Sequence, residues 1–203
     1  SVLLPFQELA LRTGATLKWF DLDEEGRVRS DTANEVITDR TKIVAVTHVG
    51  NTTGAITDIA PIIRRAHEVG AVFVLDACQS VPHLKVDFHA LDVDFAAWSA
   101  HKMYGPTGVG FLYGKREMLE ALPPANFGGS MVELAWMDQE AQYMEPPARF
   151  EAGTQPVAQV VAAGVAAEWL MNIGMEKLEA HERTITDELL KMGDIDGIRI
   201  LGP

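Results

Sequence analysis

Apolar runs and helical patterns alternate along the first half of the chain. Runs rich in apolar and β-branched residues predict strands at 16–20, 42–49, 72–76, 95–98 and 110–113. Helical spacing occurs before them at 6–12 and between them at 31–38 and 59–69. Runs without alternation, such as 43–46 and 72–75, are typical of strands that helices cover on both faces. The pattern predicts an α/β fold.

The pattern changes in the second half. A passage rich in Pro and Gly, from Pro123 to Pro147, predicts an ordered loop. Helical spacing then extends from Val157 to about Met192, with Gly174 as the expected break. Residues 198–201 resemble a strand just beginning, and the chain starts without an initiator Met. We therefore expect a piece of a longer protein.

Composition narrows the class of protein. The 203 residues are 47% hydrophobic and 23% charged, as in ordinary globular domains. A net charge of −12 argues against a nucleic-acid partner, because such binding depends on Lys and Arg neutralising phosphates. No apolar run approaches the roughly 20 residues needed to cross a bilayer, and the N-terminus lacks the pattern of a secretory signal. We expect a cytoplasmic protein without a membrane segment.

The single cysteine, Cys78, permits no internal disulfide, which fits a reducing compartment. We interpret it as a small buried thiol without a role in catalysis. Cysteines and histidines do not occur at zinc-site spacing, so we expect no metal.

Polar residues follow the predicted strands at the points where ligands bind in open α/β sheets. Asn51 follows the strand at 42–49, Asp76 ends the strand at 72–76, and Lys102 follows the strand at 95–98. Asp76 and Lys102 each have an ordinary structural interpretation when taken alone. Asp76 could cap the next helix, and Lys102 could be a solvated surface residue.

The combination of Asp76 and Lys102 favours a shared ligand. The two residues end consecutive strands, and a right-handed crossover places the carboxyl ends of parallel strands side by side. Pyridoxal 5'-phosphate (PLP) needs this pair of groups, because an amine reacts with its aldehyde and a carboxylate keeps its ring nitrogen protonated. The sequence therefore indicates a PLP site.

Four motifs resemble, in order and spacing, those of the class V aminotransferase superfamily. They are THVGNTTG at 47–54, DACQS at 76–80, SAHKMYGPTG at 99–108 and RFEAGT at 149–154. Within that superfamily the chain resembles the SufS-type cysteine desulfurases and selenocysteine lyases. The resemblance implies the large domain of fold-type I PLP enzymes, with three αβα layers and a mostly parallel sheet that contains one antiparallel strand.

The resemblance also implies roles for individual residues. Lys102 would form the Schiff base, Asp76 would pair with the pyridinium, and Gln79 would hydrogen-bond the phenolic oxygen. Ser99 and His101 would bind the phosphate.

Three further residues are implied to take part in binding. Asn51 would lie near the ring and the substrate carboxylate. Gly153 and Thr154 would reach the phosphate of the neighbouring subunit, so a homodimer is implied.

The same resemblance suggests how the chain is divided. Residues 1–172 would form the PLP-binding large domain without its N-terminal part. Residues 173–203 would supply a helix and a first strand leading into a small domain. The persulfide-forming cysteine and the arginine that holds the substrate carboxylate would come after Pro203, and a histidine that stacks on PLP would fall before Ser1.

The implied activity is removal of sulfur or selenium from cysteine or selenocysteine to give alanine, with a possible sulfur-acceptor protein as partner. Two alternatives stay open. One is another class V enzyme, such as an aminotransferase, an epimerase or a kynureninase-like hydrolase. The other is a catalytically silent PLP-binding fragment. A dinucleotide-binding domain is disfavoured, because the glycine-rich turn from strand to helix is absent.

Overall fold

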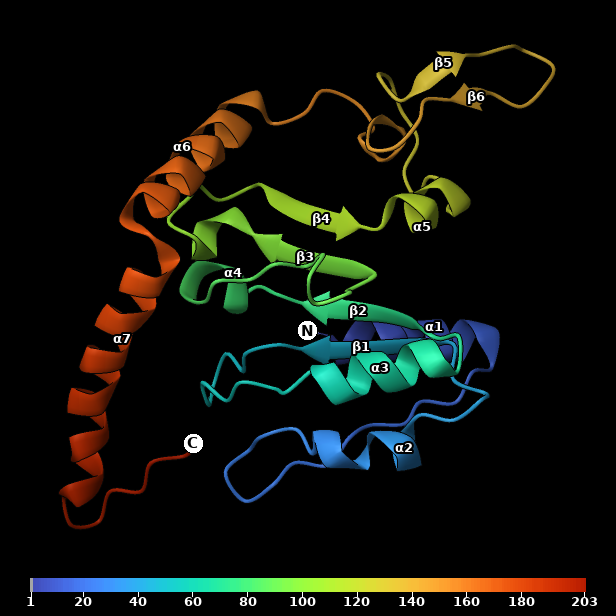
Figure 1. Cartoon of the computed structure of the whole chain (residues 1–203). Coiled ribbons are helices and arrows are strands. Elements are labelled where there is room, and N and C mark those ends of the chain that lie inside the picture. Colours follow the sequence, from blue (N-terminus) through green and yellow to red (C-terminus); the bar gives the residue numbers. More distant parts are fainter. Residues whose placement is uncertain (1) are drawn as a thin grey trace.

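A four-stranded sheet forms the centre of the computed structural model, which describes residues 2–203 (Figure 1). Its strands are β1 (Ile43–Thr47), β2 (Val72–Asp76), β3 (Phe95–Ser99) and β4 (Gly110–Gly114), in that spatial order. The first three are parallel, and β4 runs antiparallel to β3. The α/β class and the mostly parallel sheet with one antiparallel strand are therefore confirmed.

The main core lies between this sheet and helix α3 (Ala60–Glu68). Phe73 and Leu75 of β2 and Ile62 of α3 are fully buried in it. Burying each of these side chains stabilises the fold by about 1.5–3 kcal/mol. Short elements flank this core, namely the 3₁₀ turn η1 (Ser30–Thr32) and the helices α2 (Ala33–Val36) and α4 (Ser80–His83).

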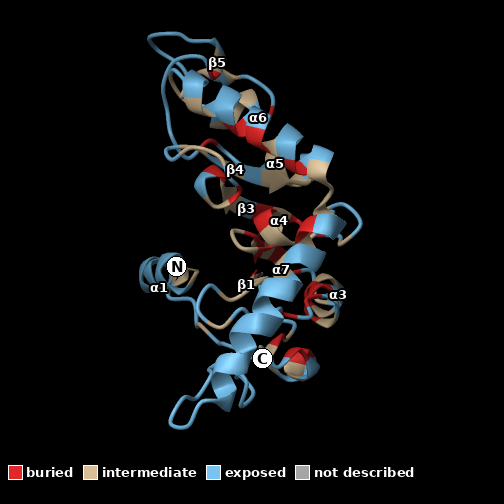
Figure 2. Ribbon diagram, turned by 90° about the vertical axis from the view of Figure 1, so that its left-hand side faces the viewer, coloured by how far each residue is buried: buried red, intermediate tan, exposed pale blue. Residues whose placement is uncertain are grey.

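Helix α1 (Leu3–Thr13) lies on the other side of β1 from α3, which gives the expected three layers (Figure 2). That third layer is thin, because α1 has no buried residue. Apolar side chains on the sheet remain exposed as well, with Ile43 at 43% and Leu112 at 60% exposure. One face of the sheet therefore carries most of the packing in this chain.

Two predicted strands are wrong. Residues 16–20 form no strand, and Trp19 within them is 71% exposed. Residues 198–201 form none either, and Leu201 is 70% exposed. A strand needs a neighbour to satisfy its backbone groups, and an apolar run does not supply one. Just after residues 16–20, Leu22 and Val28 form an isolated antiparallel bridge, which is not long enough to be a strand.

Beyond β4 the chain forms α5 (Arg116–Ala121) and then the hairpin of β5 (Val132–Leu134) and β6 (Gln142–Tyr143). This hairpin lies within the passage that was predicted to be a loop. The 3₁₀ turn η3 (Ala148–Phe150) follows it. In Figure 1 the hairpin projects from the body of the molecule beyond α5.

Helices α6 (Val157–Ile173) and α7 (Met175–Leu190) run along the edge of the sheet where β1, β2 and β3 end (Figure 1). Gly174, with φ of 89°, separates them as predicted, and η4 (Lys191–Asp194) follows α7. No single helix among residues 2–203 is long and apolar enough to cross a membrane. The two helices meet that criterion only as a pair, across an 80° bend. A contact between His83 Nδ1 and the Glu182 carboxylate (2.9 Å) and an ion pair between Lys85 and Glu176 (2.7 Å) attach α7 to the segment that contains α4.

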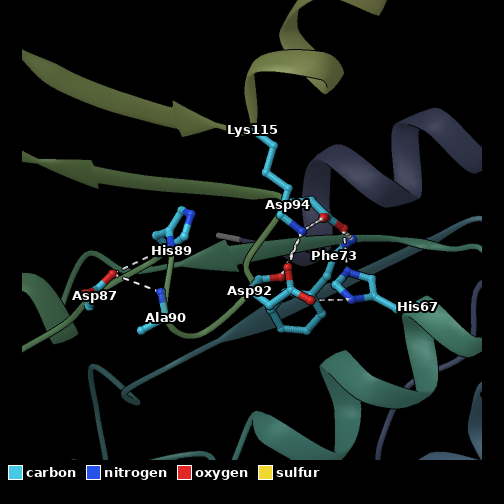
Figure 3. Close-up of polar contacts among 8 residues, drawn as sticks. All are labelled: His67, Phe73, Asp87, His89, Ala90, Asp92, Asp94 and Lys115. Carbon is cyan, nitrogen blue, oxygen red and sulfur yellow. Dashed lines mark hydrogen bonds and ion pairs between the residues drawn. The ribbon is translucent and has the colours of Figure 1, made fainter.

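An ion network at the opposite end of the sheet centres on Asp94, which is 1% exposed (Figure 3). Its carboxylate accepts hydrogen bonds from Lys115 Nζ (2.7 Å) and the Phe73 backbone N–H (2.8 Å), and it contacts His67 Nε2 (2.9 Å). Burial alone would raise the pKa of Asp94, but these partners hold that pKa below its usual value. The network joins α3, β2 and the segments that flank β3 and β4.

Candidate active site

The carboxyl ends of β1, β2 and β3 lie side by side and carry the predicted site residues. In the sheet, Asp76 pairs with Thr47 on one side and with Ala97 on the other. The parallel register thus places the turn after β1, the end of β2 and the 3₁₀ turn η2 (Ala100–Lys102) after β3 at one edge. This is the edge where ligands bind in open α/β sheets.

Asn51, Gln79 and Lys102 form one hydrogen-bonded group at this edge. The Asn51 side-chain oxygen Oδ1 accepts from Gln79 Nε2 at 2.5 Å and from Lys102 Nζ at 3.4 Å. The three residues come from the turns that follow three different strands. The structure therefore brings together an amine and two carboxamides that are far apart in the sequence.

Asp76 lies beside the same group, through Cys78. The Cys78 backbone N–H donates to Asp76 Oδ1 at 3.0 Å. Burial and the Asp76 carboxylate raise the pKa of the Cys78 thiol, whereas Lys102 and Ser99 act in the opposite direction. The Cys78 thiol therefore lies close enough to Asp76 and Lys102 to respond to both of their charges.

The sequence places Cys78 in the motif that flanks Asp76, and we interpreted it as a small buried thiol. In the structure it is only half-buried. Its place beside Asp76 has a local cause. An Asp side chain often accepts the N–H two residues later, which turns that residue back toward the carboxylate.

The segment after Lys102 is fixed by a tight turn and by a second, smaller core. The N–H groups of Met103 and Gly105 both donate to the Ala100 carbonyl oxygen, each at 2.9 Å. A Cβ at Gly105 would come within 2.9 Å of that oxygen, so the turn requires glycine. Met103 is buried with Leu170 of α6 and Leu178 of α7. Packing thus sets the position of the lysine that precedes it.

Three other predicted site residues are not joined to this group by a hydrogen bond within residues 2–203, namely His101, Gly153 and Thr154. His101 is exposed in η2, and Thr154 is exposed before α6. Gly153, with φ of 81°, donates its N–H to the Gly129 carbonyl oxygen at 2.8 Å. Within residues 2–203, Gly153 and Thr154 make no hydrogen bond with the group around Asn51.

His48 follows β1 directly, and its backbone N–H donates to the Asp76 carbonyl oxygen at 3.0 Å. Its side-chain Nδ1 is buried and has no hydrogen-bond partner within residues 2–203. Burial lowers the pKa of this imidazole, which favours its neutral form. A buried nitrogen without a hydrogen-bond partner lowers the stability of the fold by about 1–3 kcal/mol. His48 Nδ1 is such a nitrogen among residues 2–203, and it lies next to the candidate site.

Two hollows in the chain lie away from this edge. One of about 150 Å³ is lined by Ser30, Asn34 and Arg64, and one of about 300 Å³ lies beside Trp19 and Glu35. In the group around Asn51, Asn51 itself is exposed, and Gln79 and Lys102 are half-buried. Among residues 2–203, no set of three His, Cys, Asp or Glu side chains is arranged to hold a metal ion.

The mostly parallel sheet, with an amine, carboxamides and a carboxylate at its carboxyl end, has the α/β architecture of solved cysteine desulfurases of fold type I. The profile of the family described as Aminotransferase class-V matches residues 1–203, and the chain belongs to that family. The resemblance noted in the sequence is thus confirmed.

Individual relatives point to one branch of the family. "Probable cysteine desulfurase 2" of Mycobacterium leprae is 48% identical over 202 residues, which is 99% of this chain and 48% of that protein. The cysteine desulfurase CsdA of Escherichia coli has a TM-score of 0.89 at 37% identity, covering 95% of this chain and 48% of CsdA. An apo cysteine desulfurase of Thermococcus onnurineus NA1 has a TM-score of 0.93 at 34% identity, covering 99% and 50%. The chain spans about half the length of the relatives it matches.

Proposed function

We propose that this chain is the cofactor-binding part of a PLP-dependent cysteine desulfurase or selenocysteine lyase. The relatives named cysteine desulfurase over nearly the whole chain support this assignment. One structural observation carries it. Lys102 and Gln79 share the Asn51 oxygen at the sheet edge, and Asp76 lies beside them.

The chemistry of this donor set fits PLP. The Lys102 amine suits the cofactor aldehyde, and Gln79 can donate to the neighbouring phenolic oxygen. One Asp76 oxygen is engaged by the Cys78 N–H, which leaves the other for the ring nitrogen. We assign the phosphate to Ser99 and His101, with Gly153 and Thr154 serving the phosphate of a second subunit in a homodimer.

When bound, PLP supplies an electron sink for a substrate carbanion. The Asp76 carboxylate holds the proton on the ring nitrogen and so maintains that sink. With PLP and substrate bound, the Lys102 amine would move a proton at the substrate α-carbon. Asn51 lies where it can also bind the substrate carboxylate.

Cys78 is not the thiol that takes the sulfur in this proposal. Its pKa is raised, chiefly by burial, so little reactive thiolate is present at neutral pH. The thiolate that attacks the substrate sulfur, which would yield alanine and a persulfide, is assigned to the part of the relatives' length that this chain does not span. A sulfur-acceptor protein would then remove the sulfur. The single cysteine supports a reducing, cytoplasmic compartment.

We also propose the division of the chain that the sequence suggested. Residues 1–172 belong to the large domain, and residues 173–203 lead toward a second domain. The break at Gly174, where the helix direction changes by 80°, supports this boundary.

The test is absorbance spectroscopy of the purified chain with added PLP, followed by borohydride reduction and peptide mapping. We expect a visible band and a reduced adduct on Lys102. Lys102→Ala should abolish both, whereas Lys191→Ala, at an exposed lysine of η4, should leave both intact. An adduct spread over several lysines would contradict the proposal. Sulfide and alanine released from L-cysteine would separate an active enzyme from a silent fragment.

A further inference from the structure

The Asn51 oxygen is fully occupied before any ligand is considered. A carboxamide oxygen has two lone pairs, and here Gln79 Nε2 and Lys102 Nζ take one each. Rotating the Asn51 side chain would break both hydrogen bonds together. Asn51 is therefore held by the two side chains that it joins.

The turn that carries Asn51 is also well defined. Gly50 donates its N–H to the Ala55 carbonyl oxygen, and Gly54 donates to the Gly50 carbonyl oxygen, both at 2.9 Å. A Cβ at Gly50 would come within 2.8 Å of Thr53 Oγ1, so this turn closes tightly. The backbone thus presents the Asn51 oxygen from a fixed place, although the residue is exposed.

Lys102 determines which end of the Gln79 carboxamide faces Asn51. A lysine amine can only donate, so the Asn51 atom that Lys102 and Gln79 share is the oxygen, and Gln79 must present Nε2 to it. The second N–H of the same planar group then points away at a fixed angle. In the opposite orientation Gln79 would present its oxygen instead.

We propose that Asn51 is a positioning residue that orients the Gln79 carboxamide, so that one Gln79 N–H always faces the phenolic oxygen of the cofactor. The inference rests on the proposed function of this site. The arrangement of Lys102 and Gln79 matches the arrangement of the groups that they would bind, because the aldehyde and the phenolic oxygen are adjacent substituents on the pyridoxal ring. Lys102 and Gln79 are likewise adjacent, since both reach the same Asn51 oxygen. Donors that are neighbours in the protein would thus serve neighbouring groups of one ligand.

A double-mutant cycle tests whether Asn51 acts through Gln79. The variants are Asn51→Ala, Gln79→Ala and the two combined, with Thr52→Ala as the control in the same exposed turn. The first readout is the pH midpoint of the visible absorbance of bound PLP. A hydrogen bond to the phenolic oxygen stabilises its anionic form, so losing it should raise the midpoint by roughly 0.5–1 pH unit.

We expect Asn51→Ala and Gln79→Ala to raise the midpoint by similar amounts and to weaken PLP binding by about 3- to 10-fold. The double variant should shift the midpoint no further than Gln79→Ala alone, because both changes remove the same hydrogen bond. Thr52→Ala should match the unsubstituted chain. Additive shifts, or no shift in Asn51→Ala, would overturn the inference and leave the proposed function intact.

A second measurement needs no cofactor. In the PLP-free chain, the two Gln79 side-chain N–H protons should give separate NMR signals, one of them shifted by the hydrogen bond to Asn51. Asn51→Ala should remove that shift, and Thr52→Ala should not. If the unsubstituted chain gives no visible band with PLP, the proposed function fails, and the inferred role toward the cofactor is overturned with it. An unchanged Gln79 signal in Asn51→Ala overturns the inference alone.

Discussion

Lys115 Nζ lies 2.7 Å from the carboxylate of Asp94 (Figure 3), and this contact is at the end of the sheet opposite to Lys102. The Lys115 side chain also contacts Asp92, which is exposed and has a positive φ of 58°. Asp94 itself is nearly inaccessible to solvent. Ion pairs therefore join β3 and β4 at one end of the sheet, and the candidate site lies at the other end.

Replacing Lys115 with Met should destabilise the chain by about 3 kcal/mol, because it leaves a buried carboxylate without its cation. The loss is limited by His67 and the Phe73 N–H, which still contact Asp94. Urea unfolding followed by circular dichroism measures this change. Lys85→Met, which removes an exposed ion pair with Glu176, is the control and should change stability by less than about 1 kcal/mol. If both variants lost the same free energy of unfolding, the buried network around Asp94 would stabilise the chain no more than an exposed ion pair does.

The lowered pKa of Asp94 predicts how stability depends on pH. A carboxyl group with a depressed folded-state pKa contributes stability above its unfolded pKa, near 3.8, and loses it as pH falls through the lower folded pKa. The free energy of unfolding should therefore fall steeply below about pH 4. Asp94→Asn should be less stable at pH 7 but should show a shallower decline. Urea titrations between pH 7 and pH 3 measure both slopes, and parallel slopes would contradict this assignment.

The four strands of the central sheet could be predicted because each is an apolar run that pairs with a neighbouring strand, and β1, β2 and β3 each place at least one side chain in the core. The juxtaposition of Asp76 and Lys102 at one edge could be predicted as well, because the crossover rule fixes where parallel strands end. The false strand at 16–20 has a similar pattern, but the chain provides no neighbouring strand, and Trp19 remains in solvent. An apolar pattern in the sequence therefore predicts a strand correctly only where the fold provides another strand for it to pair with.

Contacts between distant side chains could not be predicted in the same way. The network of His67, Asp94 and Lys115 joins three segments, and nothing in the local pattern of any of them indicates the other two. The shared hydrogen bonds of Asn51 depend on side-chain orientation at the ends of three elements. Strand order indicates which residues meet at the edge, but their individual contacts come from three-dimensional packing.

Cys78 provides a direct test of the charges around it, because it is the single cysteine of the chain. The Asp76 carboxylate contributes to raising its pKa, and Lys102 opposes that effect. Asp76→Asn should therefore lower the pKa of the thiol and speed its alkylation by iodoacetamide several-fold at pH 8. Lys102→Ala should slow the reaction. The rates are followed by mass spectrometry, with Lys191→Ala as the control. If both charge variants changed the rate in the same direction, Asp76 and Lys102 would not flank the thiol as described.

A pair of glycine substitutions separates the geometry of the site from the stability of the chain. Gly105→Ala would place a Cβ 2.9 Å from the Ala100 carbonyl oxygen and should displace the turn that holds Lys102. We expect PLP binding to weaken by about tenfold or more, which corresponds to roughly 1.4 kcal/mol.

Gly164→Ala is the matched control, because Gly164 lies inside α6 with open space where a Cβ would be. Alanine favours a helix over glycine by about 0.5–1 kcal/mol, so this variant should be more stable and should bind PLP normally. Fluorescence titration with PLP and thermal unfolding of each variant give the two quantities. Normal PLP binding by Gly105→Ala would mean that the lysine does not depend on the tight turn that follows it. Lys102 would then be positioned mainly by the packing of Met103 against Leu170 and Leu178.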